Sequence, residues 1–200
     1  MTVLHIDSSI LGDNAVSREL SAEVARREAA RTGGEIVRRD LGAKPLPHLS
    51  GDDFLGRGAA PGERTPEQSR DAAVLDEFLA ADVVVIGAPM YNFSIPSNLK
   101  AWIDRVAVAG KTFAYTEAGP VGLATGKKAV VISTRGGLYS EGPAAGMDHQ
   151  ESYLKTVLGF LGVTDVEFVR AERLSFGPEV RAQSVADARA EIDREARLAA

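Results

Sequence analysis

The stretch Asp82–Ala88 reads DVVVIGA, and the stretch Lys128–Thr134 reads KAVVIST. Both are short, rich in β-branched residues and apolar almost throughout. Strands that face water on one side alternate apolar and polar residues, whereas strands covered on both faces do not. These two stretches therefore predict the central strands of a parallel sheet that is covered by helices on both faces.

The rest of the chain repeats the order strand, then helix. Further strands are expected at residues 3–7, 35–41 and 165–172, and helices at 17–32, 66–81, 96–108, 148–161 and 179–198. The helix at 66–81 begins with Thr65-Pro66-Glu67-Gln68, which is a capping box with proline at the first helical position. Five strands, each followed by a helix, predict a doubly wound α/β fold with right-handed crossovers.

Length and composition restrict the class of protein. The chain has 200 residues, 44% of them hydrophobic, and fits one domain spanning residues 1–200. Its formal net charge of −5 argues against nucleic-acid binding, which needs a surplus of basic side chains. The chain has no cysteine and three scattered histidines, so disulfides are excluded and no metal site is expected.

The sequence shows no sign of secretion or of membrane insertion. The first residues lack the basic segment and long apolar core of a signal peptide. The longest apolar run, at residues 83–88, is far shorter than the roughly 18 residues of a membrane span. We therefore expect a cytoplasmic protein.

Ligands of doubly wound folds bind beyond the carboxyl ends of the strands, where the strand order reverses. The loop after the first strand carries Ser8, Ser9 and Ser17 and leads into a helix. Hydroxyl groups and backbone N–H groups at a helix N-terminus bind a terminal phosphate well. Simple capping of the helix explains the same residues about equally well.

The loop after Asp82–Ala88 contains Met90, Tyr91, Asn92 and Phe93. Its aromatic rings would leave water by packing on a planar ligand, and Asn92 offers a donor and an acceptor to the edge of a heterocycle. The alternative is that the aromatic rings fold back onto the core.

The loop after Lys128–Thr134 contains Gly136-Gly137, whose backbone N–H groups could approach a ligand closely, although a bare turn also explains two glycines. Together the three loops predict a slot with a phosphate at one end and a flat ring at the other. Such a slot fits FMN better than NAD.

Other ligand-binding and catalytic motifs are either misplaced relative to the predicted strands or absent. Gly126-Lys127 is similar to part of a P-loop but precedes its strand instead of following one, and no nucleophile elbow is present. The segment Gly42–Arg64, rich in proline and glycine, is the one long stretch expected to be irregular. Loops of that length are usually functional or mobile.

At these loops the chain resembles the bacterial FMN-dependent NADH-azoreductases, also described as NADH:quinone oxidoreductases, of the flavodoxin-like superfamily. The resemblance runs essentially from end to end. Its most specific pieces are residues 88–93 (APMYNF), 112–117 (TFAYTE), 126–128 (GKK), 134–137 (TRGG) and 158–162 (LGFLG). It implies a flavodoxin-like five-stranded parallel sheet with FMN bound at its edge and NADH as electron donor.

The resemblance also implies roles for individual residues. The FMN phosphate is expected at Ser9, Ala15, Val16 and Ser17, and the flavin ring at Met90, Tyr91, Asn92, Phe93, Thr134, Arg135, Gly136 and Gly137. Family members usually carry a hydroxyl at the position of Ala15. An apolar lid over the flavin is expected from Phe113, Tyr115 and Phe160, although core packing explains Phe160 equally well. Members are homodimers whose active sites lie at the interface.

The implied reaction is a ping-pong cycle. NADH gives a hydride to the flavin and leaves, and a quinone or an azo compound then takes two electrons in the same slot. No side chain is needed as nucleophile or general acid. Two alternatives stay open: a flavodoxin-type electron carrier, which should not react directly with NADH, and a hydrolase of phosphate esters, which lacks an evident nucleophile–base pair.

Overall fold

The structure, a computed structural model, describes residues 1–198 and their side chains as far as residue 194. Its main sheet has five parallel strands in the order β2-β1-β3-β6-β7. These strands span Thr2–Asp7 (β1), Glu35–Asp40 (β2), Val83–Pro89 (β3), Lys128–Thr134 (β6) and Asp165–Ala171 (β7). The expected doubly wound α/β fold is confirmed, and the strand order reverses between β1 and β3.

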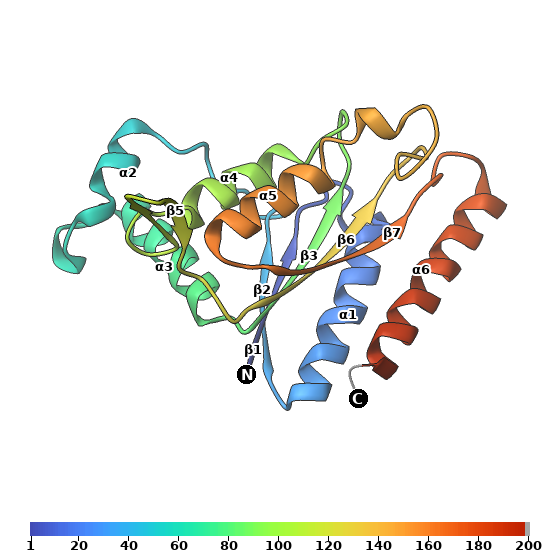
Figure 1. Cartoon of the computed structure of the whole chain (residues 1–200), viewed down its shortest axis with the longest axis horizontal. Coiled ribbons are helices and arrows are strands. Elements are labelled where there is room, and N and C mark those ends of the chain that lie inside the picture. Colours follow the sequence, from blue (N-terminus) through green and yellow to red (C-terminus); the bar gives the residue numbers. More distant parts are fainter. Residues whose placement is uncertain (199–200) are drawn as a thin grey trace.

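The two apolar stretches occupy the positions that their composition predicts. Every residue of β3 is buried, and β3 lies between β1 and β6. Figure 1 shows that the arrowheads of β3, β6 and β7 point to the same edge of the sheet. The loops that follow these strands therefore emerge together.

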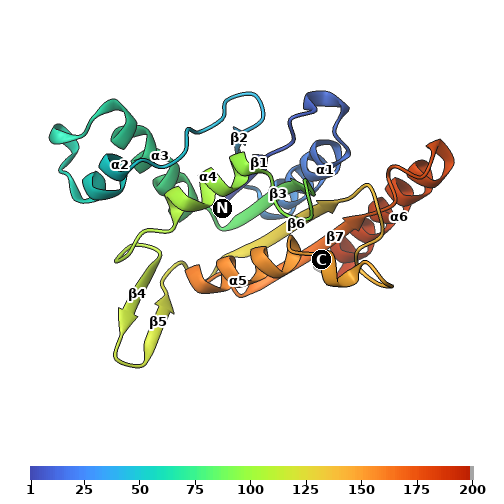
Figure 2. The same cartoon turned by 90° about the horizontal axis from the view of Figure 1, so that it is seen from above.

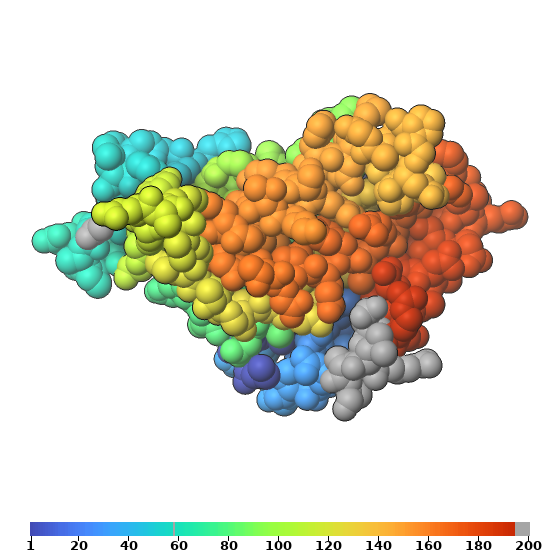
Figure 3. All heavy atoms as spheres, viewed as in Figure 1, coloured from blue at the N-terminus to red at the C-terminus, as the bar shows by residue number. Residues whose placement is uncertain are grey.

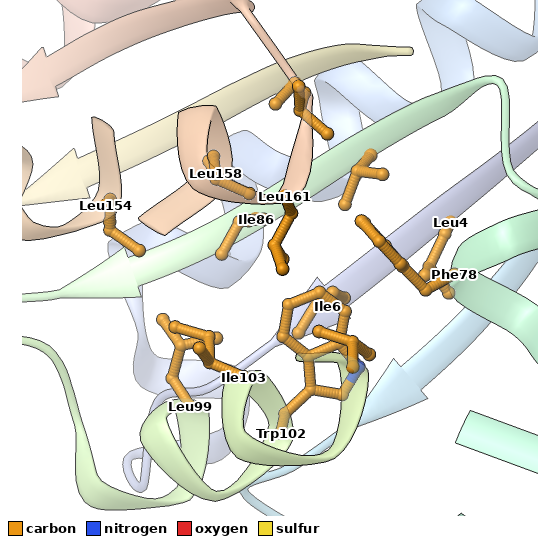
Figure 4. Close-up of a cluster of buried hydrophobic side chains, with 14 of the residues drawn as sticks. Leu4, Ile6, Phe78, Ile86, Leu99, Trp102, Ile103, Leu154, Leu158 and Leu161 are labelled. Carbon is orange, nitrogen blue, oxygen red and sulfur yellow. The ribbon is translucent and has the colours of Figure 1, made fainter. Parts of the chain in front are cut away.

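Helices cover both faces of the sheet (Figures 1 and 2). One face carries α1 (Val16–Thr32) and α6 (Pro178–Leu198). The other carries α3 (Pro66–Ala80), α4 (Ser97–Val106) and α5 (Glu151–Leu161). Figure 4 shows the core on this second face, where Trp102 of α4 points toward Phe78 of α3 and Ile6 of β1. Among the described helices, none is both long and apolar enough to cross a bilayer.

The expected helix boundaries differ from the structure by up to three residues, most of all at α5. This helix begins at Glu151 instead of residue 148. The Oδ1 atom of Asp148 accepts the backbone N–H groups of Gln150 (2.8 Å) and Glu151 (3.2 Å). Asp148 therefore caps the helix from outside it.

A two-stranded hairpin was not expected from the sequence. It is formed by β4 (Phe113–Thr116) and β5 (Gly119–Gly122), which pair antiparallel outside the main sheet. Figures 1 and 2 show the hairpin projecting at the end of the molecule opposite α6. In the space-filling view it lies at one end of the face that α5 covers (Figure 3).

The segment Gly42–Arg64 is less irregular than expected. It contains the short helix α2 (Gly51–Leu55) and two single 3-10 turns, Gly56–Gly58 and Pro61–Glu63. Ser50 and Asp53 form a capping box at the start of α2. Arg57 then fastens the segment to the end of α4 by donating to the carbonyl oxygens of Asp104 and Ala107. The rest of the segment is irregular as expected, and the short ordered pieces were not predicted because side-chain anchors of this kind leave no periodic pattern.

Candidate functional site

The loops after β1, β3 and β6 enclose a cavity of about 290 Å³ at the carboxyl edge of the sheet, which we call the edge cavity. Nine of the twelve residues predicted to bind FMN line it: Ser9, Ala15, Val16, Ser17, Met90, Tyr91, Thr134, Arg135 and Gly136. The loop between β7 and α6 adds Leu174 and Ser175, and α6 itself adds Arg181. Three loops chosen from the sequence thus meet around one space.

The start of α1 forms one wall of the edge cavity. Ala15 is the residue before the helix, and no side chain caps the first backbone N–H groups. The hydroxyl of Ser17 belongs to a residue that is 1% exposed, and among the described residues it has no hydrogen-bond partner. Unsatisfied N–H groups at a helix start carry partial positive charge and favour an anion. Simple capping therefore does not explain the hydroxyl-rich loop, and the residues present fit a phosphate.

Tyr91 joins the loop after β3 to the loop after β1. Its hydroxyl lies 3.2 Å from Oγ of Ser9 and accepts the backbone N–H of Ile10 at 3.2 Å. Ser9 is buried and also accepts the N–H of Leu11. The two loops therefore hold each other in place at the switch point.

The tip of the loop after β3 is a tight turn. Tyr91 and Ser94 exchange backbone hydrogen bonds of 2.9 and 3.1 Å, and between them Asn92 and Phe93 have φ angles of 50° and 70°. Two consecutive positive φ angles define a type I′ turn, which glycine and asparagine favour and phenylalanine rarely adopts. The backbone of Phe93 is therefore strained, and strain of this kind concentrates at functional sites.

The turn directs Phe93 outward rather than onto the core. Phe93 is 40% exposed, and its ring packs edge-to-face on Tyr139, with ring centroids 6.1 Å apart. The N–H of His149 binds the carbonyl oxygen of Phe93 at 3.0 Å. An outward aromatic ring held between two loops is available to a planar ligand.

Arg135 does not present its side chain to the edge cavity. The side chain is fully buried and forms ion pairs with Glu151 (2.5 Å), Asp148 (2.8 Å) and Glu172 (3.1 Å). Its backbone N–H and carbonyl also bind Ala171 and Leu174. Arg135 therefore holds the loop in place, whereas a direct contact with a cofactor was expected of it.

Glu172, next to Arg135, anchors the glycine loop. Its carboxylate accepts the backbone N–H groups of Tyr139 (2.8 Å) and Ser140 (3.0 Å) and the hydroxyl of Ser140. Burial alone would raise the pKa of Glu172, but these bonds and Arg135 outweigh it and hold the pKa below its ordinary value. The loop that carries Gly136 and Gly137 is thus fixed by a charged carboxylate.

A second, more apolar cavity of about 710 Å³ adjoins the edge cavity, and Tyr91 lines both. Its walls come from Ile10, Leu41, Pro45, Ile95 and Tyr153, with Asn92 and Lys100 at polar positions. Of the three predicted residues outside the edge cavity, Asn92 lies here. Phe93 and Gly137 line neither cavity, and the ring of Tyr139 lies about 3 Å from where a Cβ of Gly137 would be.

The residues predicted as an apolar lid gather elsewhere. Phe113 and Phe160 pack with their ring centroids 4.5 Å apart at the base of the hairpin, and Tyr115 is 76% exposed on β4. None of the three lines the edge cavity or the apolar cavity. Within one chain the structure does not bring them to the cofactor residues.

Sequence reasoning missed Leu174, Ser175 and Arg181, which line the edge cavity from beyond β7. The loop between β7 and α6 does not border the switch point, so no pattern singled it out. Proximity to Gly136 is a tertiary property: a methyl group on Gly136 would lie 2.8 Å from Oγ of Ser175. The only signal was the position of this loop at the carboxyl edge.

One buried cluster combines serine, histidine and aspartate. Nε2 of His5 lies 2.8 Å from Oγ of Ser21 and 3.3 Å from Oδ1 of Asp7. A catalytic triad needs the carboxylate on the ring nitrogen opposite the nucleophile. Here both groups meet the same nitrogen, and Ser21 is fully buried. The cluster cannot serve as a nucleophile and base for hydrolysis.

Comparison with known proteins agrees with the fold described above. A family model described as "Flavodoxin-like fold" matches residues 1–196. A protein of Ralstonia nicotianae named FMN-dependent NADH:quinone oxidoreductase is 56% identical over 198 residues, covering 95% of this chain and 94% of its own. A protein of the same name from Sinorhizobium fredii is 58% identical over 193 residues, covering 94% and 93%.

Solved structures resemble the whole chain. The crystal structure of the azoreductase AzrA superposes with a TM-score of 0.85 at 34% identity, covering 98% of this chain and 99% of that one. An FMN-dependent NADH-azoreductase from Bacillus anthracis, solved in complex with FMN, superposes with a TM-score of 0.82 at 27% identity, covering 98% and 100%.

Proposed function

The chain belongs to the flavodoxin-like family of FMN-dependent NADH:quinone oxidoreductases, and we propose that it binds FMN and uses NADH to reduce quinones and to cleave aromatic azo compounds. The observation that carries the proposal is the edge cavity itself. Its phosphate end has the uncapped start of α1 and the unpartnered hydroxyl of Ser17. Its other walls come from the loops that hold Phe93, Gly136 and Tyr91.

FMN, when bound, supplies the two-electron hydride chemistry. The residues of this chain bind and orient it. We assign the phosphate to the first turn of α1 with Ser9 and Ser17, and the ring to the space beside Met90 and the strained turn at Asn92-Phe93. Arg135 and Glu172 position the glycine loop without touching the ring. We propose that residues 1–200 form one FMN-binding domain.

The order of events in the proposal is ping-pong. NADH and the electron acceptor use the same slot in turn, so NADH leaves before the acceptor enters. A quinone takes one such round and an azo bond takes two, giving two amines. Solvent supplies the protons, so no side chain acts as general acid. We also propose a cytoplasmic location, which the use of NADH as donor supports.

The test is spectroscopic. We expect the purified chain to carry or to take up FMN and turn yellow, and anaerobic NADH to bleach it. Adding a quinone should restore the colour with one NADH consumed per quinone, and an azo dye should consume two. An electron carrier would keep its colour with NADH, and a hydrolase would stay colourless; either outcome would reject the proposal.

A homodimer completes the proposed site. The apolar cavity opens to solvent in one chain, and Tyr115 is 76% exposed on a hairpin whose base packs on α5 through Phe113 and Phe160. The resemblance implies a homodimer with active sites at the interface, and we assign the hairpin of a second copy to cover this cavity. A chain that elutes as a monomer while retaining full activity would contradict this assignment.

A further inference from the structure

We propose that Arg181, near the start of α6, binds the phosphate of FMN and is a cofactor residue that the sequence motifs leave out. The inference rests on the proposed function, because it assumes that FMN occupies the edge cavity. It concerns one side chain and one group of the cofactor.

The edge cavity contains two basic residues, Arg135 and Arg181, and no acidic one among the described residues that line it. Three carboxylates neutralise Arg135. Arg181 is exposed, and its guanidinium has no hydrogen-bond or ion-pair partner within the described part of the chain. Arg181 is therefore the free cation of this cavity.

Arg18 is the other obvious candidate, because it follows Ser17 directly. Its guanidinium makes two bonds to the carboxylate of Asp40, of 2.6 and 2.9 Å, on the β2 side of α1. Arg18 lines a different surface hollow and not the edge cavity. The basic residue nearest in sequence is thus unavailable to a ligand in the edge cavity.

Ion pairs fix α6 against α1 so that its first turns overhang the phosphate end. Arg189 of α6 binds Glu19 of α1, and Asp193 lies 2.5 Å from Arg27. The two helices therefore run in the same direction, side by side (Figure 1). Arg181 precedes Arg189 by about 12 Å along the axis, whereas Ser17 precedes Glu19 by about 3 Å. Measured in the same way from Asp193 and Arg27 the offset is about 3 Å, so Arg181 lies about 3–9 Å past Ser17 along the helix axes.

The phosphate end needs such a donor. Ala15 offers no hydrogen-bonding side chain to a ligand. Apart from Arg181, the donors are the N–H groups of the first turn, the amide of Asn14 and the hydroxyls of Ser9, Ser17 and Ser175. These groups are neutral, whereas the phosphate of FMN is close to a dianion at neutral pH. A guanidinium with its fork of N–H donors matches a phosphate geometrically and neutralises part of its charge.

The experiment measures dissociation constants of the full chain for FMN and for riboflavin, which has the same ring but no phosphate. The chain is freed of flavin by dialysis and titrated, and flavin fluorescence is followed. We expect Arg181→Ala to weaken FMN binding about tenfold, or about 1.4 kcal/mol, and to leave riboflavin binding unchanged. Arg181→Lys should lie between Ala and the parent chain, because a lysine keeps the charge but not the fork.

Arg26→Ala is the matched control. It removes one exposed arginine from α1, outside the edge cavity, and should change neither constant. The difference between the parent chain and Arg181→Ala should also shrink in high salt, because salt screens exposed charges.

Three outcomes would overturn the inference: equal FMN constants for Arg181→Ala and the parent chain, an equal loss for FMN and riboflavin, or a raised KM for NADH with FMN binding intact. The last outcome would mean that Arg181 binds NADH instead of the phosphate of FMN. If the parent chain itself binds no FMN, the proposed function fails instead.

Discussion

Glu172 and Arg135 join the ends of two neighbouring strands, with Oε1 of Glu172 3.1 Å from Nη1 of Arg135. Each residue directly follows its strand, Arg135 after β6 and Glu172 after β7. The same oxygen atom also accepts the N–H groups of Tyr139 and Ser140. One charged contact therefore sets the position of the whole glycine loop against the sheet.

The charge of Glu172 predicts how stability depends on pH. Its pKa is lowered in the folded chain, so its stabilising contribution is complete above the ordinary carboxylate pKa near 4.3 and is lost as pH falls through the lowered value. We expect Glu172→Gln to lower the free energy of unfolding at pH 7 by about 1–3 kcal/mol. Denaturant titrations at pH 7 and at pH 3 measure this.

The deficit of Glu172→Gln should be smaller at pH 3, because Glu172 of the unfolded parent chain is then protonated and folding to the state with the lowered pKa costs free energy. Glu179→Gln serves as control, since Glu179 is an exposed glutamate on α6 and should change little. A deficit that is equal at both pH values would show that the charge of Glu172 is unimportant.

Gly42 predicts a coupling between the end of β2 and the first loop. A methyl group on Gly42 would lie 2.1 Å from the carbonyl oxygen of Ser9, so one of the two backbones has to move. We expect Gly42→Ala to weaken FMN binding about tenfold through the displaced Ser9, with a loss of about 1–3 kcal/mol in stability. Calorimetric titration with FMN and thermal unfolding measure both effects.

Gly51→Ala is the matched control for this clash. Gly51 begins α2, and a methyl group there meets nothing within 4 Å. It should leave FMN binding unchanged. Equal behaviour of the two alanine variants would contradict the close approach of Gly42 to Ser9.

The strained turn predicts a trade between stability and binding at Phe93. Phe93→Gly and Phe93→Ala both remove the ring, but only glycine accepts a φ angle of 70° without cost. We expect the glycine variant to be more stable than the alanine variant by about 1 kcal/mol. Both should bind FMN less tightly than the parent chain, and to the same extent.

Chemical denaturation and FMN titration of the two Phe93 variants give this comparison. Ordinarily alanine is the more stable choice, because glycine loses more backbone freedom on folding. An alanine variant at least as stable as the glycine variant would therefore show that the backbone of Phe93 is unstrained. Undiminished FMN binding in both would remove Phe93 from the site.

The fold could be predicted from the sequence because strands that are buried on both faces have an apolar composition. β3 and β6 are apolar almost throughout because helices cover both of their faces, and this pattern can be recognised in the amino-acid sequence. The loops after such strands must meet at one edge, so Ser17, Tyr91 and Gly136 could be predicted to be neighbours without any contact being known.

Tertiary partners had no comparable signal. The guanidinium of Arg135 is neutralised because three carboxylates, those of Asp148, Glu151 and Glu172, lie against it from other parts of the fold. The availability of Arg181 depended on the offset between α6 and α1. The hairpin strands are four residues each, too short to establish a period. Local pattern therefore located the cavity but not which charges are free within it.

Ser17 predicts the effect of a negative charge at the phosphate end. Ser17→Glu places a carboxylate at the first turn of α1, where the partial positive charge of the helix start stabilises an anion. Without FMN we therefore expect this variant to be at least as stable as Ser17→Gln, which has the same size and no charge. The carboxylate should repel the FMN phosphate, so its dissociation constant for FMN should be about tenfold higher than that of Ser17→Gln. Riboflavin, which brings no charge, should bind both variants equally. Titrations of both variants with both flavins separate charge from bulk, and equal FMN constants for Glu and Gln would mean that the phosphate lies elsewhere than at Ser17.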